Sequence, residues 1–377
     1  MKAIYLDNAA TTEMYPSVVQ VMRRHLEGEY GNPSSLHSRG RGAKAAVESA
    51  RGHFANLIGA ERSQIVFTSS GTESVQQVLL GAFLANPKKR HMVTTAIEHH
   101  AVLQTCELLE ELGVEVTYIP VGNDCSVNAR AVLEAVRTDT LLVSVMAVNN
   151  ETGAVQPIVE LAQQIKTEHP EVLFHSDMVQ ALPVQEVNVA EIHMDFASFS
   201  SHKIHGPKGV GALYIRNDRT FKPIARGGNQ ERRRRGGTEN VPGIAGFGEA
   251  ARQLKAGRQR EFQQMEQANL AFWDAIRKIP GVYRNSPESG AKSILNVGFR
   301  GVANDVLLMR LDLEGVEASA GSACTAGSLQ PSHVLKACGF SEDVLRESVR
   351  FSFSGMTTTD EAREAAQVVQ SVVDQLV

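Results

Sequence analysis

The chain has 377 residues, of which 42% are hydrophobic and 21% are charged, and its formal net charge at pH 7 is −4. A chain of this length can bury a large core, and we expect it to form two domains. The small net charge excludes a general polyanion-binding protein, and the sequence has no apolar run of about 18 residues that could span a bilayer.

The cysteines are few and widely spaced, at Cys106, Cys125, Cys324 and Cys338. They do not indicate a disulfide framework, and none belongs to a C-x-x-C pair of the kind that binds zinc. We therefore expect neither a disulfide-stabilised fold nor a bound metal. The N-terminal residues lack a secretory signal, which favours a cytoplasmic protein.

Short apolar runs alternate with amphipathic segments between about residue 60 and residue 215. The runs predict strands at 65–67, 92–95, 114–119, 141–145, 172–174 and 211–215, and the amphipathic segments predict helices at 73–84, 101–112, 129–136 and 159–168. This alternation is typical of βαβ units, which build a mostly parallel sheet covered by helices. We therefore predict an α/β fold for this part of the chain.

A long polar segment, at 244–278, predicts a helix that connects this part to the C-terminal tail. The tail has predicted strands of its own, at 293–299, 316–318 and 348–353, followed by terminal helices. We predict a large domain at 15–255 and a smaller α+β domain that combines residues 1–14 with 256–377. The first 14 residues are expected to fold back across the active site.

The first motif with chemical content is F-T-S-S-G-T-E-S, at 67–74, in which a strand passes through Gly71 into a helix. Free amides at a helix N-terminus, together with the hydroxyls of Ser70 and Thr72, can cradle a phosphate. The same residues are also typical of an ordinary capped helix with Glu73 in its first turn. Thr238, in R-G-G-T-E-N, is a second hydroxyl that could reach a phosphate from a loop.

Two polar residues follow predicted strands. His99, in T-A-I-E-H-H-A-V-L, can stack on an aromatic cofactor and move a proton near neutral pH, or it can simply cap the next helix. Asn150, in N-N-E-T-G, can bond the phenolic oxygen of a cofactor ring, or it can belong to a turn, which Asn and Gly favour.

Lys203 lies in S-S-H-K-I-H-G-P-K-G, directly after a buried strand that ends near Phe199. A lysine at a strand end is most often solvated. A desolvated amine, however, has a lowered pKa and can form an imine with an aldehyde. Pyridoxal phosphate (PLP) is the aldehyde that enzymes keep for this chemistry, and its ring nitrogen needs an acidic partner. Asp177, at the end of the preceding strand, can be that partner.

Cys324 lies in S-A-G-S-A-C-T-A-G-S, a run of small and polar residues without apolar periodicity. An exposed thiol on such a loop is typical of a nucleophile that must move, whereas Cys106 fits a buried structural cysteine.

Arg350 alternates with apolar residues in a predicted strand, where its guanidinium can clamp an α-carboxylate. The basic run at 232–235 indicates a solvated surface strip or, alternatively, a contact for an acidic acceptor.

These motifs occur in the order of a known family: Y-L-D-N-A-A-T-T, G-N-P-S-S-L-H, F-T-S-S-G-T-E-S, I-E-H-H-A-V, N-N-E-T-G, H-S-D-M-V-Q-A, S-S-H-K-I-H-G-P-K-G, R-G-G-T-E-N, G-S-A-C-T and V-R-F-S. Together they closely resemble the NifS/IscS-like cysteine desulfurases of the class V aminotransferase group. The resemblance covers essentially the whole chain. It implies a fold-type I PLP-dependent transferase, with a mostly parallel seven-stranded sheet in the large domain.

The resemblance also implies roles for individual residues. Lys203 would bind PLP and act as acid and base, and Cys324, on a loop at about 320–333, would take the substrate sulfur as a persulfide. His99 would stack on the ring and take part in catalysis, and Arg350, with Asn150, would bind the substrate. The other cofactor contacts would come from Gly71, Thr72, Asn150, Asp177, Gln180, Ser200 and His202, with Thr238 contributed by a partner subunit.

The implied reaction converts L-cysteine to L-alanine. The persulfide would pass to an acceptor protein for iron–sulfur cluster assembly or tRNA thiolation, from a homodimer without membrane or direct nucleic-acid contacts. A selenocysteine lyase or an aminotransferase on the same scaffold is the alternative function. A non-catalytic sulfur-scaffold protein is a further alternative, which the presence of Lys203, Asp177 and Cys324 disfavours.

Overall fold

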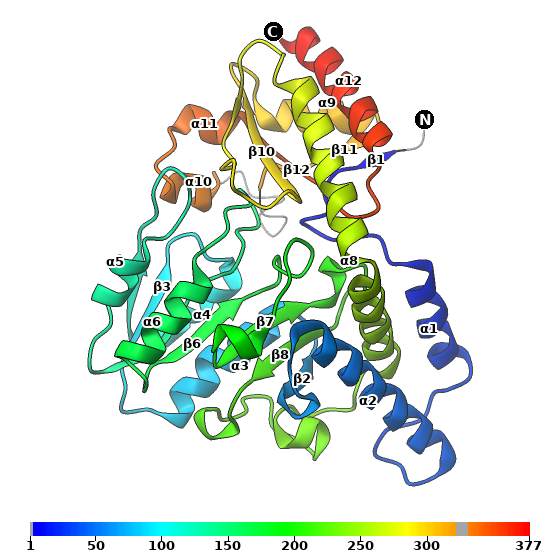
Figure 1. Ribbon diagram of the computed structural model, residues 1–377, viewed down its shortest axis with the longest axis vertical. Coiled ribbons are helices and arrows are strands. Elements are labelled where there is room, and N and C mark those ends of the chain that lie inside the picture. The colour runs from blue at the N-terminus through cyan, green and yellow to red at the C-terminus, as the bar shows by residue number, and fades with distance from the viewer. Residues whose placement is uncertain (1–2, 322–330) are drawn as a thin grey trace.

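The computed structural model of the chain describes residues 3–321 and 331–377. Helices and strands gather in a larger group around a wide sheet and a smaller group around a narrow sheet (Figure 1). The long helix α8 (Val241–Ile276) runs from the larger group into the smaller one.

The wide sheet has seven strands among the described residues, in the order β2-β8-β7-β6-β5-β3-β4. Five neighbouring strands are parallel, and β8 runs antiparallel to both of its neighbours. The sheet is therefore mostly parallel, which confirms the predicted fold class. The strands are β2 (Ile65–Thr68), β3 (His91–Thr95), β4 (Glu115–Ile119), β5 (Thr140–Ser144), β6 (Leu173–Asp177), β7 (Phe196–Ser200) and β8 (Gly211–Ile215).

Helices cover both faces of this sheet because its strands are apolar on both sides. Consecutive strand residues point to opposite faces, so that Leu173 packs in one core and Phe174 in the other. The first core contains α3 (Gly71–Ala85) and α4 (His100–Glu111). The second contains α1 (Pro16–Glu27), α2 (Ser38–Ile58), α5 (Ala129–Glu134), α6 (Ile158–Glu168), α7 (Val189–Ile192) and the first half of α8.

Helix α8 connects the two groups through its buried residues. Phe247 and Leu254, in its first half, belong to the second core of the wide sheet, whereas Met265 and Phe272 belong to the core of the smaller group. Its 36 residues confirm the predicted connecting helix. In the part of the chain that the structure describes, no helix is both long enough and apolar enough to cross a membrane.

The smaller group contains an antiparallel sheet in the order β12-β10-β9. Its strands are β9 (Val282–Arg284), β10 (Ile294–Phe299) and β12 (Ser348–Ser352), and its helices are α9 (Asn304–Leu313), α10 (His333–Ala337), α11 (Glu342–Glu347) and α12 (Thr359–Leu376). The N-terminal strand β1 (Ile4–Tyr5) pairs in parallel with β11 (Val316–Glu317). The division into domains at 15–255 and 256–377 stays a prediction.

A disulfide between Cys125 and Cys338 differs from the sequence expectation. The two residues are 213 positions apart, and their Cα atoms lie 5.2 Å from each other. Both belong to a small apolar cluster that packs α10 against the segment before α4, with Ile97 and Val334 among its members. The sequence did not indicate this pair because distant cysteines that meet in a folded core have no local spacing pattern.

Candidate active site

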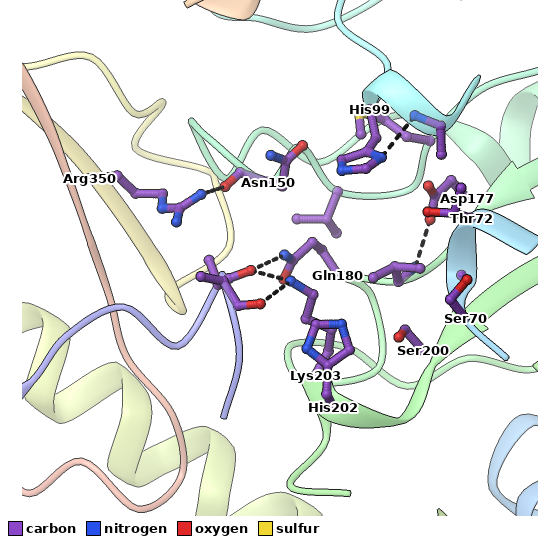
Figure 2. A pocket seen from close by; sticks show the side chains of 17 residues that line it. Ser70, Thr72, His99, Asn150, Asp177, Gln180, Ser200, His202, Lys203 and Arg350 are labelled. Atoms are coloured by element: carbon purple, nitrogen blue, oxygen red, sulfur yellow. Dashed lines mark hydrogen bonds between the residues drawn. The ribbon is translucent and has the colours of Figure 1, made fainter. Parts of the chain in front are cut away.

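One cavity of about 190 Å³ lies where β6 and β7 of the wide sheet end (Figure 2). The carboxyl ends of parallel strands are where α/β proteins commonly bind ligands. Of the sequence-predicted site residues that the structure describes, all but Thr238 line this cavity: Gly71, Thr72, His99, Asn150, Asp177, Gln180, Ser200, His202, Lys203 and Arg350. The fold therefore brings together residues that are spread over about 280 positions of the sequence, from Gly71 to Arg350.

Lys203 reaches the cavity from the turn that follows β7. Its Nζ donates hydrogen bonds to the backbone carbonyl oxygens of Ala9, at 2.5 Å, and Ala10, at 2.8 Å. The Nε2 of Gln180 donates to the same Ala9 oxygen at 2.9 Å. The N-terminal segment thus crosses the site beside the lysine, which confirms the expectation that it folds back over this region.

Asp177 is the last residue of β6, and its carboxyl group is buried. Its Oδ1 accepts a hydrogen bond from the Val179 amide at 2.9 Å. Burial raises the pKa of Asp177, and its interactions with His99, the Val179 amide and Lys203 oppose that rise. A cation held next to this carboxylate would favour its ionised form.

His99 is the N-cap residue of α4, and it also lines the cavity. Its Nδ1 accepts a hydrogen bond from the Ala101 amide at 3.0 Å. In the neutral imidazole the proton is therefore assigned to Nε2. Helix capping and cofactor stacking were separate interpretations of the sequence, and the geometry makes them compatible.

In the turn after Val148, the neighbouring residues Asn149 and Asn150 have different roles. The Oδ1 of Asn149 accepts hydrogen bonds from the amides of Glu151 and Thr152, each at 2.9 Å, so this side chain stabilises the turn. Asn150 instead lines the cavity. The turn chemistry and the site chemistry that the sequence left as alternatives are thus divided between the two residues.

Another part of the cavity wall is formed by the N-terminus of α3, through Gly71 and Thr72. A Cβ atom at Gly71 would lie only 2.9 Å from the Val179 Cγ2, so a larger residue here would force the Val179 side chain to shift. His202 lines the same cavity, and burial, with the charges of Lys203 and Lys208, lowers its pKa to about 3. Its Nδ1 is buried without a hydrogen-bond partner among the described residues.

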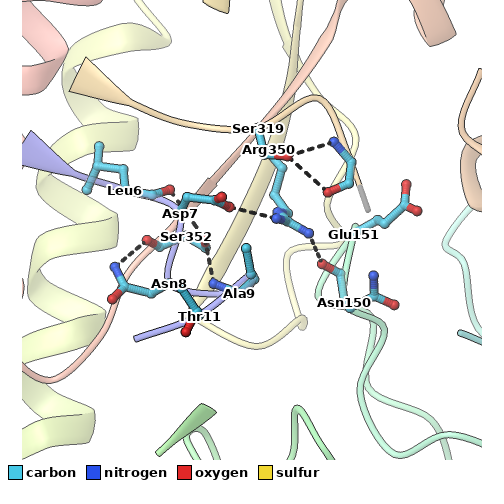
Figure 3. Close-up of polar contacts among 12 residues, drawn as sticks. Leu6, Asp7, Asn8, Ala9, Thr11, Asn150, Glu151, Ser319, Arg350 and Ser352 are labelled. Carbon is cyan, nitrogen blue, oxygen red and sulfur yellow. Dashed lines mark hydrogen bonds and ion pairs between the residues drawn. The ribbon is translucent and has the colours of Figure 1, made fainter. Parts of the chain in front are cut away.

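Arg350, on β12, completes the wall from the smaller group. Its Nη2 donates to the Asp7 Oδ1 at 2.7 Å, and its Nη1 donates to the Asn150 carbonyl at 2.9 Å (Figure 3). The guanidinium is buried, with a relative exposure of 1%. The sequence analysis predicted Arg350 but missed Asp7, whose only local signal is its place in the motif Y-L-D-N-A-A.

Comparisons with known proteins agree with this arrangement. Residues 4–364 match the family described as Aminotransferase class-V. A protein of Dictyoglomus turgidum (strain DSM 6724 / Z-1310), named cysteine desulfurase IscS, is 41% identical over 378 residues, which cover 100% of this chain and 95% of the relative. The chain belongs to the cysteine desulfurases of the aminotransferase class-V family.

Two solved structures also resemble this member of the family. A structure titled NIFS-LIKE PROTEIN has a TM-score of 0.94 and 33% identity, and it covers 99% of this chain and 100% of its own. A structure titled SspA in complex with cysteine has a TM-score of 0.83 and 35% identity, and it covers 93% of this chain and 98% of its own. The predicted fold-type I architecture is therefore confirmed.

Enzymes of this family depend on PLP, and the described residues of the desulfurase fit that cofactor. Its phosphate needs free donors, such as the amides at the N-terminus of α3 and the unpartnered imidazole nitrogen of His202. Its ring nitrogen needs a buried acid and its aldehyde needs an amine, which Asp177 and Lys203 can supply in one cavity.

Two predicted site residues remain. Cys324 lies outside the described residues. Thr238 is exposed and does not line the cavity of its own chain. Its contribution to a partner subunit therefore stays a prediction.

The basic run at 232–235 fits the sequence interpretations only in its first half, because Arg232 and Arg233 are exposed and the second half is not. Arg234 is buried, and its Nη1 donates to the Ser63 carbonyl at 2.7 Å. Arg235 forms an ion pair with Glu73, at 2.9 Å, in the first turn of α3. The sequence could not show this because the hydrophobicity pattern gives no sign of an arginine that is buried by specific polar partners.

Glu98, next to His99, is a buried residue that the sequence analysis missed. Its Oε1 accepts hydrogen bonds from the Thr95 hydroxyl and the Met146 amide, each at 2.8 Å. It thereby joins the segment that carries His99 to the segment that leads to Asn150. Burial raises the pKa of Glu98 to about 8.

Proposed function

We propose that the chain is a homodimeric, cytoplasmic cysteine desulfurase that converts L-cysteine to L-alanine and transfers the sulfur through a persulfide on Cys324. The observation that carries this proposal is the single cavity in which the Lys203 amine, the Asp177 carboxylate and the Arg350 guanidinium meet. An amine, an acid and a carboxylate-binding cation are the groups that PLP chemistry on an amino acid requires.

Bound PLP supplies an electron sink for the charge that develops when the substrate loses its Cα proton. Lys203, on leaving the carbonyls of Ala9 and Ala10, would bind the cofactor and then remove that proton. Asp177 would hold a proton on the ring nitrogen, and Asn150 with Gln180 would contact the ring oxygen. Arg350 would bind the α-carboxylate of the substrate through charge-assisted hydrogen bonds.

The sulfur step would belong to Cys324. Its thiolate would attack the sulfur of the substrate, so that a new sulfur–sulfur bond forms while the carbon–sulfur bond of cysteine breaks. The electron pair of the broken bond would stay with the substrate carbons, which take up a proton and leave as L-alanine. The atoms balance without an external oxidant, since cysteine and a thiol give alanine and a persulfide.

The phosphate of the cofactor would be held by the N-terminus of α3 and by residues of the lysine turn. Gly71 and Thr72 would contribute from the helix, and Ser200 and His202 from the end of β7 and the following turn. His99 would stack on the ring. Because the pKa of His202 is lowered to about 3, its imidazole is neutral at pH 7 and offers one N–H donor.

Exposed features of this chain support the homodimer. Thr238 is exposed, as we expect of a residue that completes the phosphate site of a partner subunit. Tyr30 and Leu36 are also exposed, with relative exposures of 69% and 91%. Ser34, which lies between them in sequence, and Glu239, next to Thr238, line one surface hollow. These neighbouring features are what a single subunit interface would cover.

We propose that the persulfide sulfur goes to an acceptor protein of iron–sulfur cluster assembly or of tRNA thiolation. Arg232 and Arg233, the exposed half of the basic run, offer a contact for an acidic acceptor surface.

The test of the function is incubation of the purified enzyme with L-cysteine and a small thiol reductant. Alanine release, with one added sulfur atom on the Cys324 peptide in mass spectrometry, would support the proposal. Transfer of the amino group to a keto acid without alanine release would contradict it.

A further inference from the structure

Asp7 and Arg350 form a partly buried ion pair at the edge of the cavity. The Asp7 Oδ1 lies 2.7 Å from the Arg350 Nη2, and the side-chain exposures are 20% and 1% (Figure 3). Arg350 comes from the middle of β12, and Asp7 forms a bridge with Ser352 of the same strand. The ion pair thus joins two segments that are 343 positions apart in the sequence, at the point where Arg350 lines the cavity.

The guanidinium still has donors to offer a ligand. Asp7 and the Asn150 carbonyl each take one N–H group, on Nη2 and Nη1. The Nε of Arg350 is buried and has no hydrogen-bond partner among the described residues. A guanidinium has five N–H donors in a fixed fork, so a second carboxylate can bind without displacing Asp7.

Asp7 is also tied to the lysine side of the site through its backbone. Its carbonyl accepts hydrogen bonds from the Ala10 amide, at 3.0 Å, and from the Tyr5 hydroxyl, at 3.0 Å. The turn closed in this way presents the carbonyls of Ala9 and Ala10 to the Lys203 Nζ. The orientation of Arg350 and the position of the segment beside Lys203 therefore depend on the same four-residue turn.

We propose that Asp7 is a positioning residue that orients Arg350 for the α-carboxylate of the substrate. This inference rests on the proposed function, in which Arg350 receives that carboxylate. Asp7 accepts a hydrogen bond from Nη2 of the guanidinium. The N–H groups that neither Asp7 nor the Asn150 carbonyl uses remain for the carboxylate of the ligand. Without Asp7, the Asn150 backbone carbonyl is the only partner left to the buried guanidinium among the described residues, and the planar group can rotate away from the cavity.

The test compares two ligands that differ in the carboxylate. L-Alanine has an amino group and an α-carboxylate, whereas ethylamine has the amino group alone. Their dissociation constants are measured in the PLP-loaded enzyme from the change in cofactor absorbance, and the melting temperature is recorded for each variant. The variants are Asp7→Ala, Asp7→Asn and Arg350→Ala, with Asp139→Ala as the control, because Asp139 pairs with Arg137 outside the site.

The expected results separate orientation from stability. Asp7→Ala should weaken L-alanine binding about tenfold and change ethylamine binding by no more than about twofold, because only the carboxylate contact is lost. Asp7→Asn should bind L-alanine at least as tightly as the parent, since its amide oxygen still holds Nη2 and no longer repels the ligand carboxylate. Asp139→Ala should leave both dissociation constants unchanged.

Several outcomes would overturn the inference. Asp7→Ala could weaken both ligands equally or lower only the melting temperature, which would make the ion pair purely structural. Asp7→Asn could lose as much L-alanine affinity as Asp7→Ala, which would exclude orientation by the contact. If Arg350→Ala loses the preference for L-alanine while Asp7→Ala keeps it, the inference alone fails. If Arg350→Ala keeps the preference, the assigned role of Arg350 in the proposed function fails as well.

Discussion

The Nζ of Lys203 lies 2.8 Å from the carbonyl oxygen of Ala10, although the two residues are 193 positions apart in the chain. Together with the Ala9 carbonyl oxygen, this acceptor holds the amine in one place beside the N-terminal segment. To bind an aldehyde, the amine must leave both acceptors. The N-terminal segment therefore stabilises Lys203 in one position and must release it for catalysis.

Lys203→Ala should abolish alanine formation from L-cysteine, because the cofactor-binding amine and the base for the Cα proton are lost together. Alanine is measured by amino acid analysis after single and multiple turnovers. The matched control is Lys208→Ala, which removes an exposed lysine five positions later and should keep activity close to that of the parent. Turnover by Lys203→Ala at the parental rate would show that Lys203 is assigned wrongly.

Glu98 should make stability depend on pH. Its pKa is raised to about 8 by burial, above an unfolded-state value of about 4.3, so the folded protein holds this proton more tightly. The free energy of unfolding should then fall as the pH rises between those two values, because the unfolded chain loses this proton first. Glu98→Gln cannot ionise and should flatten that slope in denaturant titrations. An unchanged slope in the variant would exclude this role of Glu98.

The Cys125–Cys338 disulfide predicts a specific thiol count. The chain has four cysteines, so the unfolded, unreduced protein should show two reactive thiols, Cys106 and Cys324, and all four after reduction. Reduction should also lower the free energy of unfolding by about 2–4 kcal/mol, and Cys338→Ser should make stability insensitive to the reductant. Four reactive thiols before reduction would show that the pair is not bonded in the purified protein.

Thr238 provides a test of the homodimer. Thr238→Ala should weaken PLP binding in a titration of the cofactor-free enzyme, because one hydroxyl of the phosphate site in the opposite subunit is lost. The sedimentation mass of the variant should remain that of two chains. A parent enzyme that sediments as one chain with full cofactor occupancy would contradict the proposed interface.

The sequence predicted most of the cavity because its residues follow local patterns. Asp177 and Ser200 each end an apolar strand, and parallel strands in one sheet bring their carboxyl ends together. Gly71 marks the passage from a strand into a helix. The strands of the sheet and the helices α3, α4, α5 and α6 were predicted within a few residues for the same reason, whereas α1, α2 and α7 were not predicted.

The partners that the sequence did not predict are brought together by tertiary packing alone. Asp7 with Arg350 and Cys125 with Cys338 are pairs of distant residues without a spacing pattern. Arg234 is polar but buried, because backbone carbonyls accept its hydrogen bonds. Such contacts depend on the complete fold, and hydrophobicity patterns do not encode them.

Cys324 is the residue on which the desulfurase account depends most. Cys324→Ser keeps the size and polarity of the side chain, so the fold and cofactor binding should be retained. A hydroxyl is a far poorer nucleophile toward sulfur than a thiolate, and the carbon–sulfur bond of cysteine should therefore stay intact. The matched control is Cys106→Ala, because burial raises the pKa of that thiol to about 12 and leaves it unreactive.

The most direct measurement is alanine release from L-cysteine by Cys324→Ser, with cofactor absorbance recorded in the same sample. The account predicts that cysteine still changes the cofactor spectrum, that essentially no alanine appears and that no persulfide forms on the protein. Cys106→Ala should release alanine as the parent does. Undiminished alanine from Cys324→Ser, or an amino group passed on to a keto acid, would contradict the assignment of this chain as a cysteine desulfurase that acts through Cys324.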